Sequence, residues 1–194
     1  MDTCKKNTRF EKDELWQIFV AAAFPLHVWA IILFLNDISW IAERTNVWDA
    51  IGVAGYGIVF SGLESILVWL IMVVIGLVFL RKWAKNKRGA LLCSLSLAIM
   101  GGAILGQLLF FIPPPSSIMW GGVLISNQNP RLLINGVIGL VIGSGTLFLA
   151  YCAVYSEKFQ SVLFKILDRL SPLMGLYLFL DLLGLIIVII RNIT

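Results

Sequence analysis

Five polar side chains interrupt the long apolar runs of the sequence: His27, Glu64, Gln107, Asn135 and Asp181. Three of them, the histidine and the two acids, can exchange a proton. A carboxylate near the centre of a bilayer costs about 2.5 to 3.5 kcal/mol on insertion scales, so Asp181 is the hardest of the five to explain as a passive residue. The chemistry that these residue types indicate is proton exchange or the binding of a small polar solute.

The surroundings of Asp181 favour its neutral form. Apolar residues flank it, and on a helix Tyr177 shares its face at position i−4. His27 is the only histidine in the chain, so it is the group that can supply a compensating positive charge. If Glu64 lies nearby, the three groups would titrate as one unit. We expect an outward-facing cavity lined by these three residues together with Gln107, Asn135 and Tyr177.

Four of the five polar residues also have a purely structural interpretation. His27 can bond to a neighbouring helix, and Glu64 can reach headgroups or water from its place near one end of an apolar run. Gln107 and Asn135 can hold two helices together through a hydrogen bond of about 0.6 kcal/mol.

The residue supply argues against several kinds of catalytic or metal site. One histidine is too few for a multi-histidine zinc site or a bis-histidine haem. Cys4, Cys93 and Cys152 lack the CxxC spacing of metal ligands, and we expect free thiols. Ser144 lies between two glycines but has no histidine near it in the sequence. We therefore predict no catalytic residues, no metal and no cofactor, and the sequence holds no catalytic motif that would indicate an enzyme.

The elements that must position these residues are membrane-spanning helices. The chain is 59% hydrophobic and 13% charged, with a mean hydropathy of +0.92, whereas soluble domains are about 25% charged. About 20 apolar residues in a helix cross a hydrocarbon core of about 30 Å. The sequence predicts an all-α polytopic bundle that forms a single membrane domain, with five spans near 15–35, 60–80, 90–112, 132–155 and 172–190.

The distribution of Lys and Arg predicts how the spans are oriented. The amino-terminal tail, the basic cluster at 81–88 and the segment 156–171 together hold 12 of the 15 Lys and Arg residues. Because basic residues accumulate on the cytoplasmic side, we expect an internal N-terminus and an external C-terminus. A multi-pass protein of a bacterial or archaeal cytoplasmic membrane fits this pattern. The net charge of +4 is explained by topology, and no nucleic-acid partner is expected.

The segments between the spans carry further predictions. An amphipathic pattern over 157–170 predicts an interfacial helix, which ends where Ser171 and Pro172 start the last span as cap and first residue. The segment 36–49 is expected to be an external loop, with a short helix lying on the outer surface as an alternative. The glycine-rich stretch 51–59 either extends the second span outward or lies against the other helices. The long connection 113–131 is a candidate lid or a plain connector.

Small residues mark the faces on which helices can approach closely. Two GxxxG pairs occur, Gly102 with Gly106 and Gly139 with Gly143. We predict that the second pair packs against another helix, with the third span as the expected partner.

Two functional hypotheses of different classes follow. In the first, the chain is a small transport protein that conducts or exchanges a proton or small solute through the outward-facing cavity. In the second, it is a non-catalytic membrane subunit or scaffold that binds other transmembrane helices, with a cytoplasmic partner at the 157–170 helix. The expected partners are the lipid bilayer, further copies of the chain in a homo-oligomer, or other membrane subunits.

Overall fold

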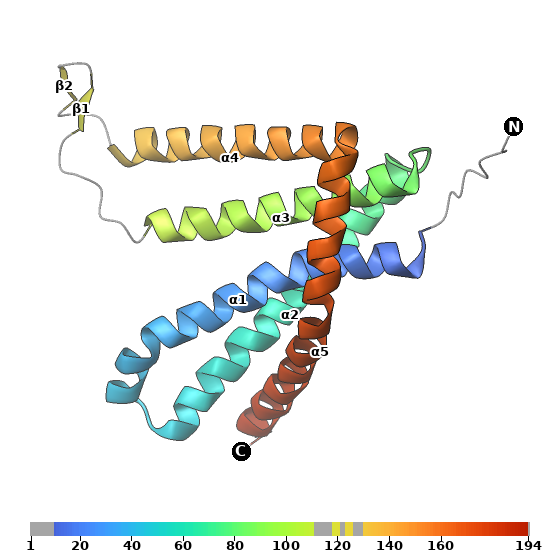
Figure 1. The fold of residues 1–194 in the computed structure, drawn as a ribbon. Helices are drawn as coiled ribbons and strands as arrows, with labels where there is room; N and C mark the ends of the chain where they lie inside the picture. The colour runs from blue at the N-terminus through green and yellow to red at the C-terminus, as the bar shows by residue number, and fades with distance from the viewer. Residues whose placement is uncertain (1–9, 111–117, 121–122, 126–129, 194) are drawn as a thin grey trace, which may run out of the picture.

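Five long helices and one small hairpin make up the part of the chain that the structure, a computed structural model, describes: residues 10–110, 118–120, 123–125 and 130–193 (Figure 1). The elements are α1 Lys12–Arg44, α2 Val47–Val78, α3 Lys85–Phe110, β1 Ile118–Trp120, β2 Val123–Ile125, α4 Pro130–Tyr155 and α5 Glu157–Ile193. All five helices are long and apolar enough to cross a membrane. The predicted helical bundle is thus confirmed in its main features, and the hairpin is an addition to it.

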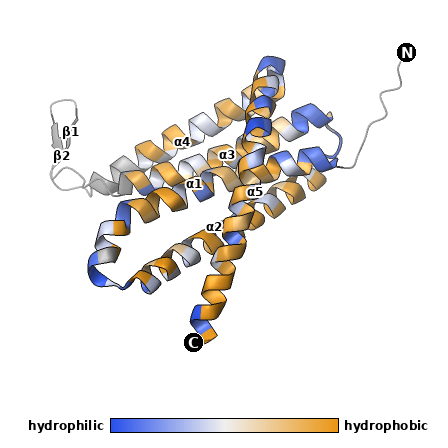
Figure 2. Cartoon of the chain, turned by 60° about the horizontal axis from the view of Figure 1, so that its bottom comes forward, coloured by the Kyte–Doolittle hydropathy of each residue, from blue (hydrophilic) through white to orange (hydrophobic). Residues whose placement is uncertain are grey.

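Polar residues gather at the two ends of the helices. Figure 2 shows hydrophobic residues along most of the length of the helices and hydrophilic residues at the α1–α2 turn and at the opposite ends. We call the end that holds residues 81–88 the basic end and the end that holds the α1–α2 turn the far end. Lys85 bonds to Glu11 at the basic end, and Arg191 bonds to Asp49 at the far end. The inward orientation of the basic end remains a prediction.

The segment 36–49, which we expected to be a loop, is mostly helical. Helix α1 continues to Arg44, and only Thr45 and Asn46 separate it from α2. The side chain of Asn46 accepts a hydrogen bond of 2.8 Å from the backbone N–H of Asp49, which satisfies one of the free donors at the start of α2. Because Asn46 caps α2 in this way, a turn of two residues is enough where the charged residues had indicated a loop.

The glycine-rich stretch 51–59 belongs to α2 and lies against α5. Gly55 is buried there, and Gly184 of α5 faces it so closely that a Cβ on Gly184 would lie 3.0 Å from the carbonyl oxygen of Gly55. The two glycines therefore let the backbones of α2 and α5 approach closely. The stretch therefore makes α2 longer than the predicted second span, and it also packs against α5.

Helix α5 runs without a break from Glu157 to Ile193, so the predicted boundary at Ser171 and Pro172 is wrong. Its buried residues keep one helical register through this point: Gln160, Leu163, Leu167, Met174, Tyr177 and Gly184. Ser171 accepts a hydrogen bond from the indole N–H of Trp16 in α1 at 2.6 Å. Continuous packing of one face outweighs the hydrogen bond that the proline lacks. The interfacial location of 157–170 remains a prediction.

The hydrophobic core lies in the half of the bundle nearer the basic end. Ile18 of α1, Leu92 of α3, and Leu167 and Met174 of α5 are almost fully buried there. Helix α4 is peripheral, since Ala153 is the one buried residue among 136–155. In the 113–131 connection, β1 pairs with β2 in antiparallel register, and the rest of that candidate lid lies outside the described residues.

Candidate functional site

His27 and Asp181 come together from α1 and α5. The Nε2 atom of His27 lies 3.0 Å from Oδ1 of Asp181, and its Nδ1 atom lies 2.8 Å from the carbonyl oxygen of Ala23. The ring of Tyr177 stacks on the imidazole with 4.9 Å between centroids and 9° between planes. The histidine side chain is 3% exposed and the Asp181 side chain 22%. Three of the predicted site residues therefore form one cluster.

The hydrogen bonds of His27 determine how many protons the pair holds. A carbonyl oxygen can only accept, so Nδ1 must donate to Ala23. Nε2 and Asp181 then share one proton, either as imidazolium with carboxylate or as imidazole with carboxylic acid. The pair is electrically neutral in both arrangements, which suits a site inside a membrane. Removing the proton would leave a carboxylate facing a nitrogen lone pair.

Glu64 and Gln107 line a separate cavity of about 550 Å³ between α1, α2 and α3. Asp37 and Ser61 also line it, and most of the remaining wall is hydrocarbon or aromatic. Gln107 is held in place because its Oε1 accepts a hydrogen bond from the indole N–H of Trp29. This volume and this mixture of apolar wall with a few polar groups are typical of a small-molecule site.

The predicted single cavity is therefore divided between two faces of α2. A Cβ at Gly62 would lie 2.8 Å from Oδ1 of Asp181, so this face of α2 touches the carboxylate. Glu64 follows two residues later, about 200° around the helix, and faces the other cavity. Asn135 belongs to α4, but its side chain lies outside the described residues.

The glycine pairs behave differently from the prediction. Gly102 approaches α4, since a Cβ there would lie 2.8 Å from Cγ2 of Ile142. A Cβ at Gly106, Gly139 or Gly143 would meet no described atom within 4 Å. The prediction that Gly139 and Gly143 face the third span is thus wrong, because α4 presents Ile142 to α3 instead.

A buried ion pair between Glu14 and Arg88 was missed from the sequence. Arg88 donates from Nε and Nη2 to the two carboxylate oxygens of Glu14, each at 2.7 Å. The side chains are 1% and 2% exposed, and the guanidinium carbon lies 4.2 Å from the centroid of the Phe10 ring. Each residue is the last charged one before a long apolar run, a signal that could have identified the pair.

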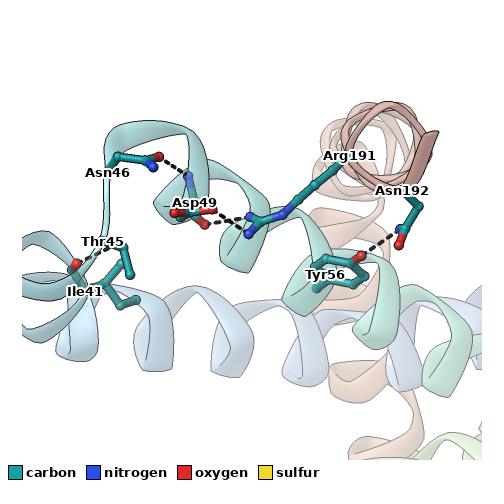
Figure 3. A network of polar contacts seen from close by, with 7 residues as sticks. All are labelled: Ile41, Thr45, Asn46, Asp49, Tyr56, Arg191 and Asn192. Atoms are coloured by element: carbon teal, nitrogen blue, oxygen red, sulfur yellow. Dashed lines mark hydrogen bonds and ion pairs between the residues drawn. The ribbon is translucent and has the colours of Figure 1, made fainter. Parts of the chain in front are cut away.

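A second ion pair links α5 to the start of α2 at the far end (Figure 3). Arg191 of α5 donates to Oδ1 of Asp49 at 2.6 Å and to the carbonyl oxygen of the same residue at 3.1 Å. Its guanidinium lies over Gly52, where a Cβ would come within 1.7 Å of Nη1. Asn192 donates to the hydroxyl oxygen of Tyr56 at 2.7 Å, and Tyr56 also lines the Glu64 cavity. The end of α5 therefore contacts the wall of that cavity.

Comparison with family models, with curated proteins and with solved structures gave no match. The five apolar helices define the chain as a multi-pass membrane protein. The predicted site residues whose side chains are described form two sites that share α2: the His27–Asp181 pair and the Glu64 cavity.

Proposed function

We propose that the chain is a small solute carrier of a bacterial or archaeal cytoplasmic membrane. It binds its solute in the Glu64 cavity and gains or loses a proton at the His27–Asp181 pair. One observation carries this proposal: a single turn of α2, from Ser61 to Glu64, contacts both sites. Ser61 and Glu64 line the cavity, while Gly62 between them lies against the Asp181 carboxylate.

The coupling follows from the proton that the pair shares. With the proton present, Asp181 bonds to His27, and its carboxylate lies against Gly62 without overlapping it. Without it, the carboxylate and the Nε2 lone pair repel each other, and Asp181 has little room to move because α2 lies against it. Tyr177 is the other titratable side chain that the described residues place against His27. A shift of α2 relative to α5 would move Glu64 and change how the cavity binds its solute.

The test is proton movement in reconstituted vesicles. Purified protein is placed in liposomes that contain a pH-sensitive dye, and a pH gradient is imposed in the presence of cationic, neutral or anionic small solutes. We expect wild-type protein to speed the collapse of the gradient with one solute class. The Asp181→Asn variant should not, while Asp13→Asn, a change at an exposed carboxylate, should behave like wild type. Gradients as stable as in protein-free vesicles with every solute would overturn the carrier proposal.

The carrier is oriented with its basic end in the cytoplasm. Cysteine labelling in intact cells tests this: an impermeant reagent should reach a cysteine added after Thr194 and should miss Cys4. The reverse labelling pattern would invert the direction of the proposed transport.

A non-catalytic subunit is the second candidate, and two observations favour it. Gly139 and Gly143 lie open on the peripheral helix α4, as a face for another transmembrane helix would. A cleft of about 640 Å³ at the basic end lies beside Lys87, Phe164 and Lys165, within reach of a cytoplasmic partner. Purification separates the candidates, because a carrier should give a homogeneous monomer or homo-oligomer alone. A subunit should aggregate unless its partners are co-expressed.

A further inference from the structure

We infer that the Glu64 cavity takes a lipophilic organic cation, meaning a substituted ammonium or phosphonium group with apolar substituents. This inference rests on the carrier proposal for the same cavity and adds the chemical class of the ligand.

The charges around the cavity are of one sign. Its lining holds two carboxylates, Asp37 and Glu64, and no Lys, Arg or His. Glu64 is half-buried, and among the described residues it makes no hydrogen bond or ion pair. An ionisable side chain inside a membrane almost always has a partner or faces a polar cavity. A cation in the cavity would supply that partner, whereas an anion would be repelled by the two carboxylates.

The uncharged part of the wall indicates what kind of cation fits. Four aromatic side chains line the cavity: Trp29, Phe34, Tyr56 and Phe60. Aromatic faces attract organic cations, more strongly where water is excluded. A small hydrated metal ion would use none of this apolar surface, and the described residues hold no group of three or more His, Cys, Asp or Glu side chains that could bind one. The volume of about 550 Å³ suits a ligand of drug size.

The position of the cavity gives such a ligand a route. It lies between membrane-spanning helices, and its lining runs from Ile41 near the α1–α2 turn to Glu64, which lies deeper along α2. A cation with apolar substituents concentrates at the membrane interface, close to the part of this lining that lies nearest the α1–α2 turn. The same chemistry occurs in the choline headgroup of a lipid, so the experiment has to separate these two sources.

The probe is tetraphenylphosphonium, and tetraphenylborate is the matched anion of nearly the same size and shape. Binding of each to the full chain in a neutral detergent is measured by equilibrium dialysis. We expect saturable binding of the phosphonium and none of the borate. Glu64→Gln should weaken phosphonium binding by about tenfold or more, which corresponds to about 1.4 kcal/mol. Asp13→Asn, at an exposed site outside the cavity lining, should leave binding unchanged.

A second variant keeps the charge of Glu64 and fills the cavity with a larger side chain. Gly57 lines the cavity, and a Cβ there would meet nothing within 4 Å, so Gly57→Leu should fill the cavity without disturbing the fold. We expect it to lose phosphonium binding while Glu64→Asp retains most of it. Equal phosphonium affinity in wild type and Glu64→Gln, or equal affinity for the borate, would overturn the inference.

Three further outcomes identify the source of the cation or separate this inference from the carrier proposal. Displacement of the phosphonium by phosphatidylcholine but not by phosphatidylglycerol would support the inference and assign the cation to a lipid headgroup. Vesicle transport that is driven only by anionic or neutral solutes would support the carrier proposal and overturn the inference of a cationic ligand. Tight phosphonium binding without any proton movement would support the cationic ligand and overturn the carrier proposal.

Discussion

Each end of the bundle is held by an ion pair, and the two pairs differ in burial. At the basic end, Arg88 and Glu14 are 1% and 2% exposed, and the core surrounds them. At the far end, Arg191 and Asp49 are 29% and 36% exposed, and the Glu64 cavity lies near them. A buried pair resists separation because either partner alone would be an uncompensated charge, whereas an exposed pair separates easily into water. The basic end is therefore expected to stay fixed while the far end opens.

The largest expected effect is at the buried pair. Replacing Arg88 by Ala leaves Glu14 buried and unpaired, and we expect a loss of about 3 to 5 kcal/mol in the free energy of unfolding. Unfolding in a detergent titration, followed by tryptophan fluorescence, measures this loss. Lys85→Ala, which removes the exposed bond to Glu11, is the matched control and should cost about 0 to 1 kcal/mol. Similar losses in both variants would remove the contrast between buried and exposed pairs.

The next effect lies between the two ends, at the contact of α2 with Asp181. Gly62→Ala places a methyl group 2.8 Å from Oδ1 of Asp181, so the carboxylate or α2 must shift and the bond of Asp181 to His27 is disturbed. We expect a cost of about 1 to 3 kcal/mol from overpacking, together with loss of proton movement in vesicles. Gly57→Ala, whose added methyl group meets no described atom within 4 Å, is the control for stability and should cost nothing. If both variants lose the same stability, the contact of Gly62 with Asp181 does not constrain the carboxylate.

The exposed pair should contribute little to stability and more to motion. Arg191→Ala is expected to cost about 0 to 1 kcal/mol, because the pair is half-exposed. Hydrogen exchange should nevertheless become faster at the start of α2, where Arg191 binds Asp49, and stay unchanged around Arg88. A loss as large as that of Arg88→Ala would show that both ends are equally fixed.

The smallest effect on stability is expected on α4, which takes part in neither ion pair. Gly143→Leu on α4 should leave the thermal stability of the purified chain unchanged, since a Cβ there meets no described atom within 4 Å and the position is exposed. Gly102→Leu should lower it, because Ile142 lies against that position. A large loss for Gly143→Leu would mean that the exposed face of α4 is covered by another copy of the chain.

The sequence predicted the five helices because long apolar runs are governed by the thickness of the bilayer. It did not predict where those helices end or join. Ser171 and Pro172 resemble a helix start, but the residues that bury one face of α5 continue past them in the same register. The charged segment 36–49 resembles a loop, yet the cap at Asn46 needs only a two-residue turn. Local signals of this kind are outweighed by contacts between helices.

The candidate sites were predictable as residues but not as partners. His27 and Asp181 stand out as polar groups in apolar runs, and Tyr177 follows from helical spacing. Nothing in the spacing shows that Glu64 faces away from them, because that depends on how α2 is rotated against α5. Arg88 was grouped with its basic neighbours as a topology signal, since a sequence does not reveal which member of a charged cluster finds a buried partner.

The pairing of Glu14 with Arg88 also bears on biosynthesis. A chain is oriented while it is being inserted, and with the predicted topology the basic residues of the 81–88 cluster would act at that stage. Arg88 can meet Glu14 only after α1, α2 and the start of α3 have been synthesised and brought together. From then on its charge is neutralised inside the protein. With that topology, the same guanidinium would orient the nascent chain first and hold the finished bundle together later.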